Sequence, residues 1–175
     1  MLTTEDFKKH IEVLSNGKYL SYDEGKSAFE YIMTGNATDI LISSFLTSLK
    51  IIFINSGISH DLIAAGADIM REKAIKINAS DDTIDIVGTG GDGHNTLNIS
   101  TATALVISGT GIKVAKHGNY SASSMSGSAD VLISLGINIK NDISNVQKCL
   151  DECGICFLFA PKHHSAMKHV MNVRK

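Results

Sequence analysis

Hydrophobic residues in the first 78 positions recur at the three- and four-residue spacing of amphipathic helices. Phe7, Ile11 and Leu14 share one face of a first predicted helix, and Ser21 with Glu24 forms the capping-box pattern that begins a second. No alternation of the β type appears in this stretch, so residues 1–78 are predicted to form a helical domain. The boundaries of the later helices are expected at residues typical of helix ends and caps, namely Gly35, Asp39 and either Ser59 or His60.

The pattern changes at Thr83, where short apolar runs rich in β-branched or aromatic residues alternate with helical spacing. Buried strands are predicted over residues 83–87, 112–118 and 155–161. Strands that alternate with helices indicate parallel βαβ units, so residues 79–175 are predicted to be the first part of an α/β domain with a parallel sheet. The helices of this part are expected over residues 100–108, 128–135, 145–153 and from 166 onward.

Two loops containing glycine follow consecutive predicted strands, over residues 88–93 and 116–120. The carboxyl ends of parallel strands are where α/β sheets bind their ligands. Backbone without side chains can approach a phosphate closely, and a helix that begins near Ser100 directs its positive end to the same place. Hydroxyl and carboxylate groups suit Mg2+ that also binds phosphate oxygens. The loops therefore predict a site for Mg2+ and a ligand phosphorylated at both ends; glycine turns and a serine-rich surface loop without a ligand are the alternative.

Two other motifs have competing interpretations. Gly88, Gly90 and Gly93 spell the dinucleotide-binding pattern, but the loop does not open directly into a helix, and lysines stand on the next strand instead of an acidic residue. Cys153 and Cys156, followed by two histidines, suggest a zinc or redox site. A structural zinc site needs a second well-spaced ligand pair, so packing is the favoured interpretation of these cysteines.

Composition narrows the class of protein without identifying it. The chain has 175 residues, of which 43% are hydrophobic and 19% charged, as in soluble globular proteins. A net charge of -2 with no basic block gives no reason to expect a nucleic-acid partner. The apolar runs are short and the N-terminus has no signal-peptide pattern, so no membrane association is expected. Three cysteines without a disulfide framework favour the cytoplasm.

Three motifs in the second part of the chain occur in the order and spacing of one enzyme family. They are GTGGDGHNTLNIST from residue 88, KHGNYSASSMSGSADVL from residue 116 and FLFAPKHHSAMKHVMNVRK from residue 157. The segment LSYDEGKSAFEYIMTGNATD in the helical part fits the same family. On these residues the chain resembles the anthranilate phosphoribosyltransferase family over essentially its whole length.

The resemblance implies transfer of phosphoribose from phosphoribosyl pyrophosphate (PRPP) to the amine of anthranilate in tryptophan biosynthesis. It also implies a homodimer through the N-terminal helices, Mg2+ as cofactor and Ser100 as the Mg2+ ligand. The residues implied to bind PRPP are Gly88, Gly91, Asp92, Thr96, Asn98, Ile99, Ser100, Thr101, Lys116, Ser123, Ser124 and Ser128. Those implied to contact anthranilate are Gly88, His117, Asn119 and Arg174, the last through the carboxylate.

Some features depart from the family pattern. Tyr120 and Met125 stand where the family commonly has cations beside the PRPP loop. The family is about twice as long, and its second magnesium motif lies in the half that is missing, so the chain is expected to be truncated and weakly active or inactive. A non-catalytic PRPP-binding or assembly module is the first alternative function. An enzyme that transfers phosphoribose to another acceptor is the second.

Overall fold

The computed structural model describes residues 2–88, 97–121 and 126–173. These residues divide into two compact units. The first contains the chain up to Ala74 together with the residues from His164 onward, and the second contains Ile75–His163. Helices make up the first unit, and strands with helices make up the second.

The helical unit contains the four helices predicted from the sequence, and each begins at a serine or threonine cap. The side chain of each cap residue accepts a hydrogen bond from the backbone N–H three residues later, which satisfies a donor that the helix leaves unpaired. At Ser21 the capping box with Glu24 is complete. The helices are α1 (Thr4–Ser15), α2 (Tyr22–Met33), α3 (Asp39–Ser56) and α4 (His60–Lys73).

An aromatic cluster forms the centre of this unit. The ring of Phe7 stacks on Tyr31 and Phe45 with centroids 5.0 and 5.4 Å apart, and Phe29 meets Phe45 edge-on at 5.7 Å. Phe7 and Phe45 are completely buried. The cluster joins α1, α2 and α3, so one set of side chains fixes three helices.

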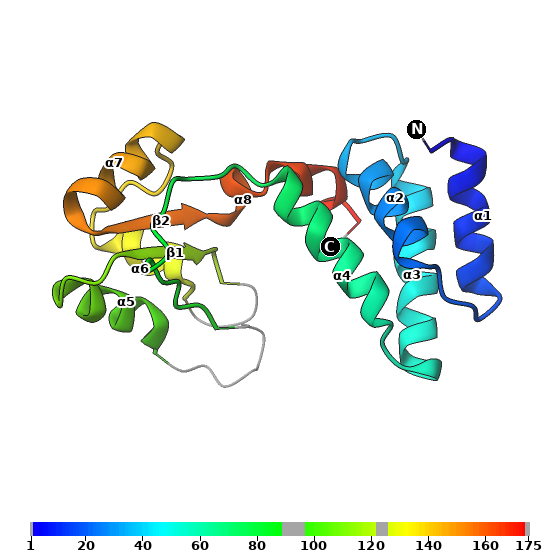
Figure 1. Ribbon diagram of the computed structural model, residues 1–175, viewed down its shortest axis with the longest axis horizontal. Helices are drawn as coiled ribbons and strands as arrows, with labels where there is room; N and C mark the ends of the chain where they lie inside the picture. The colour runs from blue at the N-terminus through cyan, green and yellow to red at the C-terminus, as the bar shows by residue number, and fades with distance from the viewer. Residues whose placement is uncertain (1, 89–96, 122–125, 174–175) are drawn as a thin grey trace. The chain divides into compact units, whose positions relative to one another are not determined.

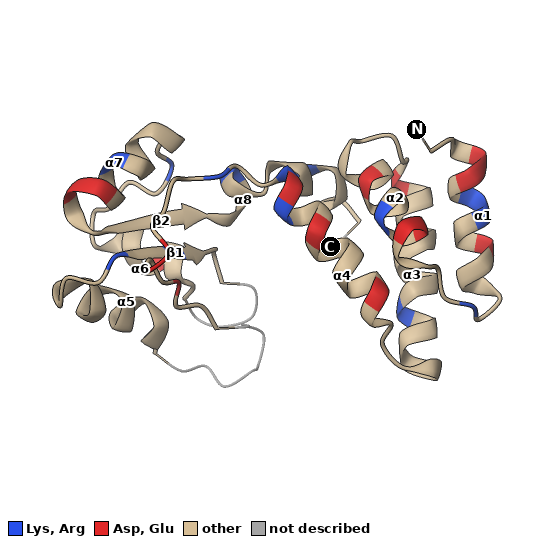
Figure 2. Cartoon of the chain, viewed as in Figure 1, with Lys and Arg blue, Asp and Glu red and all other residues tan. Residues whose placement is uncertain are grey.

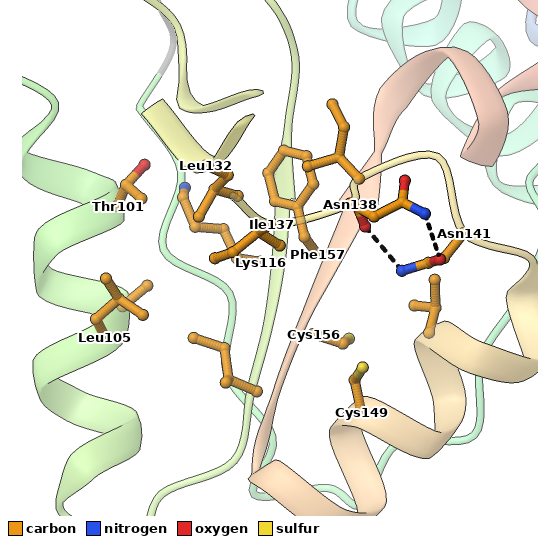
Figure 3. A pocket seen from close by; sticks show the side chains of 14 residues that line it. Thr101, Leu105, Lys116, Leu132, Ile137, Asn138, Asn141, Cys149, Cys156 and Phe157 are labelled. Atoms are coloured by element: carbon orange, nitrogen blue, oxygen red, sulfur yellow. Dashed lines mark hydrogen bonds between the residues drawn. The ribbon is translucent and has the colours of Figure 1, made fainter. Parts of the chain in front are cut away.

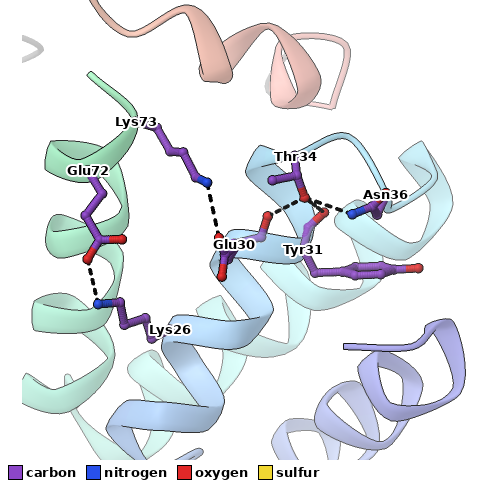
Figure 4. Close-up of polar contacts among 7 residues, drawn as sticks. All are labelled: Lys26, Glu30, Tyr31, Thr34, Asn36, Glu72 and Lys73. Carbon is purple, nitrogen blue, oxygen red and sulfur yellow. Dashed lines mark hydrogen bonds and ion pairs between the residues drawn. The ribbon is translucent and has the colours of Figure 1, made fainter. Parts of the chain in front are cut away.

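Close packing and a row of polar contacts join α2 to α4. A Cβ atom at Gly25 would lie 2.6 Å from the Leu62 side chain, so glycine lets the two helices approach closely. Lys26 pairs with Glu72 at 2.6 Å and Lys73 with Glu30 at 3.1 Å (Figure 4). Because both ion pairs are solvent-exposed, each contributes less than about 1 kcal/mol, and the buried contact dominates.

The chain returns to the helical unit at its end. The sequence predicts an α-helix from residue 166, but the segment is a 3-10 helix, η1 (Ser165–Val170), so this prediction is wrong in type. Met167 and Val170 stand three residues apart, which places both on one face of a helix with three residues per turn. Both pack into the helical core, and η1 contacts α2 and α4, as Figure 1 also shows.

Helix α3 is long and apolar enough to cross a membrane by length and composition. That is weak evidence, because core helices of soluble proteins pass the same test. Ile42, Phe45 and Ile52 of α3 pack in the helical core. The prediction that the protein has no membrane association stays a prediction.

The second unit is built around a small parallel sheet. Strands β1 (Val114–Gly118) and β2 (Ile155–Phe159) pair in register from Val114 with Ile155 to Gly118 with Phe159. Helices precede, connect and follow these strands, which confirms the predicted α/β class (Figure 1). The helices are α5 (Ile99–Gly109), α6 (Ser128–Ser134), α7 (Ile143–Cys153) and α8 (Ala160–His163).

The strand predicted over residues 83–87 is reduced to a single bridge between Ile84 and Val114. Ile84 donates to the Lys113 carbonyl at 3.0 Å and accepts from Ala115 N–H at 2.9 Å. Beyond that bridge, the Asp85 carboxylate accepts the His117 backbone N–H at 3.0 Å. A side chain thus takes the place of the backbone carbonyl that a continuing strand would offer.

Candidate functional site

Two hydrogen bonds join residues 85–86, which follow the bridge at Ile84, to residues 116–117 at the end of β1. Lys116 Nζ donates to the Ile86 carbonyl at 2.7 Å, and the Asp85 carboxylate accepts from His117 N–H. Lys116 is only 4% exposed as a residue, and burial lowers the pKa of its ammonium group while Asp85 raises it. The segment that enters the first glycine loop is therefore held beside the segment that enters the second.

The beginning of the first loop lies against the amino end of α5. A Cβ atom at Gly88 would lie 3.8 Å from Ser100 Oγ. Thr101 donates its hydroxyl to the Asn98 side-chain oxygen at 2.6 Å, so Asn98 does not cap the helix with its side chain. The Ile99 N–H donates to the Leu97 carbonyl at 2.7 Å, the amino end of the helix carries a partial positive charge, and Figure 2 shows no charged residue on this helix. This end of α5 is suited to an anion.

The second loop is closed by backbone contacts around Asp130. Its carboxylate accepts hydrogen bonds from Gly127 N–H at 2.7 Å and Ser121 N–H at 3.1 Å. These two donors lower the pKa of Asp130, in that order of importance. The Asn119 carbonyl accepts from Ala129 N–H at 3.1 Å. The loop therefore returns to its own starting point, and its beginning and its end lie together.

Glycine makes this closure sterically feasible. A Cβ atom at Gly127 would lie 2.5 Å from the Tyr120 carbonyl carbon and 2.6 Å from the Asn119 oxygen, which are both backbone atoms. At Gly118 a Cβ atom would lie 2.7 Å from the Phe157 ring. Gly118 and Gly127 therefore allow neighbouring segments of the chain to pack closer than a side chain would permit.

A histidine pair stands beside the ends of the strands. The rings of His117 and His163 meet edge-on with centroids 5.8 Å apart. Burial lowers the pKa of His117, the nearby Asp85 raises it and Lys116 lowers it further. Neutral His117 is therefore favoured near pH 7, where it has one nitrogen donor and one acceptor. The sequence left the role of His163 open, and its place beside His117 makes it a candidate site residue.

Tyr120, which stands where the family commonly has a positively charged residue, packs against another aromatic ring. The Tyr120 ring meets Phe159 edge-on at 5.3 Å, and Tyr120 is 42% exposed. Aromatic pairs of this kind contribute about 0.5–1.5 kcal/mol beyond burial. Tyr120 thus anchors the second loop to the end of β2.

The described residues of the predicted site lie at the amino end of α5, at the end of β1 and at the two ends of the second loop. Asn119 is exposed next to the loop closure, and Ser128 Oγ donates to its carbonyl at 3.3 Å. Ile99 exposes its side chain to solvent. The described residues of the predicted site are Gly88, Asn98, Ile99, Ser100, Thr101, Lys116, His117, Asn119 and Ser128. Gly91, Asp92, Thr96, Ser123, Ser124, Met125 and Arg174 lie outside the described residues.

The chemistry of the described donor set fits Mg2+ only together with a ligand. Within residues 2–88, 97–121 and 126–173, no group of three or more His, Cys, Asp or Glu side chains could hold a metal ion by itself. Mg2+ usually binds through one or two protein groups, waters and phosphate oxygens. The Ser100 hydroxyl beside Gly88 is one such oxygen donor at the anion-suited end of α5.

Two family models match the chain in succession. The helical bundle domain of a glycosyl transferase family matches residues 8–74, and the a/b domain of a glycosyl transferase family matches residues 80–175. The anthranilate phosphoribosyltransferase of Parvibaculum lavamentivorans is 48% identical over 169 residues, which cover 97% of this chain and 48% of that protein.

Solved structures agree with this match. Anthranilate phosphoribosyltransferase from Saccharomyces cerevisiae in complex with PRPP and Mg is 30% identical with a TM-score of 0.85, over 98% of this chain and 51% of that one. The same yeast enzyme in complex with 4-fluoroanthranilate is 28% identical with a TM-score of 0.80, over 98% and 49% of the two chains. The chain spans about half the length of the relatives that it matches. Because both domain models match in order and the relatives share one activity, the chain belongs to the anthranilate phosphoribosyltransferase family.

Proposed function

We propose that the protein provides the PRPP-binding part of an anthranilate phosphoribosyltransferase, which transfers phosphoribose from PRPP to the anthranilate amine and releases pyrophosphate. The observation that carries this proposal is the position of Gly88 near the Ser100 hydroxyl at the amino end of α5, two residues after Ile86, which accepts a hydrogen bond from Lys116. The yeast relative in complex with PRPP and Mg supports it.

The described residues have distinct tasks in this proposal. The first turn of α5 binds pyrophosphate oxygens, because the amino end of a helix favours an anion. Ser100 holds Mg2+, which neutralises charge on the departing pyrophosphate when it is bound. His117 and Asn119 orient the acceptor, since both lie at the end of β1 on the side of the second loop. An aromatic amine is already a nucleophile, so positioning supplies most of the rate acceleration.

Titration with Mg2+ and PRPP tests the first step. We expect calorimetry to show PRPP binding that requires Mg2+. Ser100→Ala is expected to weaken PRPP binding about tenfold or more, because the hydroxyl oxygen that would ligate Mg2+ is lost. Ser108→Ala, on the same helix and away from its amino end, is the matched control and is expected to bind as the unaltered chain does.

Two results would redirect the proposal. Binding of PRPP that ignores both Mg2+ and Ser100→Ala would contradict the placement of the metal. Tight binding of Mg2+ and PRPP without any turnover of anthranilate would favour the non-catalytic module. Turnover with another amine or base would favour an enzyme that transfers phosphoribose to an acceptor other than anthranilate.

We also propose that the helical unit forms a homodimer. Ile51 and Ile54 stand three residues apart near the end of α3, and Ile58 follows shortly after the helix ends; they are 54%, 72% and 64% exposed. Ile63 at the start of α4 is 55% exposed. Large exposed apolar side chains close together in the sequence are what a self-association surface would use, because extended apolar patches mark interaction sites in soluble proteins.

Sedimentation of charged variants tests the dimer. We expect Ile54→Asp to weaken self-association on the order of a hundredfold, because the symmetric contact buries the substitution twice. Ile133→Asp places the same charge on an exposed isoleucine of α6 and is expected to leave association unchanged. Equal effects of the two variants would count against a contact through α3.

A further inference from the structure

Asp85 contacts the predicted site from outside the set of residues predicted for it. Its carboxylate accepts the His117 backbone N–H at 3.0 Å, and the carbonyl of the neighbouring Ile86 accepts from Lys116 Nζ at 2.7 Å. Adjacent residues of one segment therefore bind adjacent residues of the other. A backbone carbonyl would also satisfy the His117 N–H, so the carboxylate adds a property that this hydrogen bond does not require, a negative charge.

That charge matters because Lys116 is a cation largely removed from solvent. Lys116 is 4% exposed as a residue, and the pocket that it lines with Thr101, Leu132 and Phe157 is mostly apolar (Figure 3). Burial of an ammonium group is costly unless an opposite charge compensates it. In the part of the chain that the structure describes, no carboxylate forms an ion pair with Lys116. The Ile86 carbonyl accepts a hydrogen bond from the ammonium group but carries no net charge.

The Asp85 carboxylate acts electrostatically on both residues of the facing segment. Burial lowers the pKa of Lys116, and Asp85 raises it. Burial also lowers the pKa of His117, Asp85 raises it, and the positive charge of Lys116 lowers it further. The ring of His163 contacts His117 as well, with centroids 5.8 Å apart. One negative charge thus opposes the effect of burial at two neighbouring residues.

We propose that Asp85 is a positioning residue with two separable actions: its carboxylate oxygen holds the end of β1 beside residues 85–86, and its negative charge favours the cationic form of Lys116. The inference rests on the proposed function, because a phosphorylated ligand is what an ammonium group at this place would serve. Asp85 acts on that ligand only through Lys116 and His117.

Two substitutions separate the two actions. Asp85→Asn keeps an oxygen acceptor for the His117 N–H and removes the charge, whereas Asp85→Ala removes both. Asp81→Asn removes the same charge from another exposed aspartate, four positions earlier, and is the matched control. NMR titration of the unliganded chain at low ionic strength, where charges are least screened, measures the first effect. We expect the pKa values of Lys116 and His117 to fall in Asp85→Asn and to stay unchanged in Asp81→Asn.

Hydrogen exchange of the His117 amide measures the second action. We expect this amide to exchange about tenfold faster in Asp85→Ala than in Asp85→Asn, because only the alanine variant lacks an acceptor for it. Equal exchange in the two variants, or pKa values of Lys116 and His117 that do not change in Asp85→Asn, would overturn the positioning role. The titration of Asp85→Asn decides the matter if Asp85→Ala fails to fold.

Calorimetry with Mg2+ and PRPP measures the consequence for the ligand. We expect Asp85→Asn to weaken PRPP binding about two- to fivefold and Asp85→Ala about tenfold or more, since the second loses a hydrogen bond to a charged group as well. Equal affinities in Asp85→Asn and Asp81→Asn would overturn the action of Asp85 on the ligand. An unaltered chain that shows both NMR effects and binds no PRPP would contradict the proposed function while confirming the two actions of Asp85.

Discussion

Phe45→Ala is expected to lower the free energy of unfolding of the helical unit by about 3–5 kcal/mol, the usual cost of removing a buried aromatic ring. Phe45 is completely buried and contacts the rings of Phe7 and Phe29, which belong to two other helices. Its removal leaves a cavity that three helices must close together. Urea unfolding followed by tyrosine fluorescence measures the loss, because three of the four tyrosines belong to this unit.

Ile40→Ala is the matched control for that measurement. It removes an aliphatic side chain from the same helix at a position that is 78% exposed, so its effect is expected to stay within about 0.5 kcal/mol. A loss at Phe45 as small as the loss at Ile40 would mean that the aromatic cluster does not fix the three helices.

Gly127→Ala is expected to destabilise the α/β unit by about 2–3 kcal/mol and to abolish binding of Mg2+ and PRPP if the proposed function holds. The new methyl group would overlap the backbone of Tyr120 and Asn119, which cannot rotate away as a side chain can. The second loop must therefore separate from its own beginning. Thermal unfolding by circular dichroism measures the stability change, and calorimetry measures the binding.

The pKa of Asp130 reports whether the second loop has opened in Gly127→Ala. In the closed loop, the N–H groups of Gly127 and Ser121 lower the pKa of Asp130 below 3.8. The contact therefore stabilises the fold above pH 3.8, and this stabilisation is lost as the pH falls through the lowered pKa. We expect Gly127→Ala to return the Asp130 pKa towards 3.8, as measured by carboxyl NMR.

Gly109→Ala distinguishes these effects from any general cost of adding a methyl group. Gly109 ends α5, and nothing lies within 4 Å of a Cβ atom placed there. Alanine at an unstrained position is expected to stabilise the protein by about 0.4–1 kcal/mol, because it restricts the unfolded chain. An unchanged Asp130 pKa in Gly127→Ala would contradict the closure of the loop through that glycine.

Local features of this fold could be predicted from the sequence because they depend on residues a few positions apart. The Ser21 and Glu24 capping box forms as predicted, and the strands around residues 114–118 and 155–159 follow their β-branched and aromatic runs. The position of Gly88 near Ser100 is also consistent with the motif, because the two residues lie at the two ends of one loop. Local chemistry is sufficient in each of these cases.

Long-range contacts account for what could not be predicted. Residues 165–170 are helical by spacing, but their three-residue face packs against α2 and α4 and favours the tighter helix. Asp85 interrupts a strand by bonding His117, which is 32 residues away. The proximity of His117 to His163 depends likewise on how separate segments pack, and no local pattern contains that information.

The two hydrogen bonds between the segments 85–86 and 116–117 have a thermodynamic consequence for ligand binding. They join residues 85–86 to residues 116–117, so a ligand that touches one segment and a ligand that touches the other act on a single hydrogen-bonded unit. Coupling between two such ligands is reciprocal: whatever factor the first contributes to the affinity of the second, the second returns to the first. If the proposed function holds, the order in which PRPP and anthranilate arrive affects the kinetics of assembly, whereas the affinity of the complete complex is the same by either route.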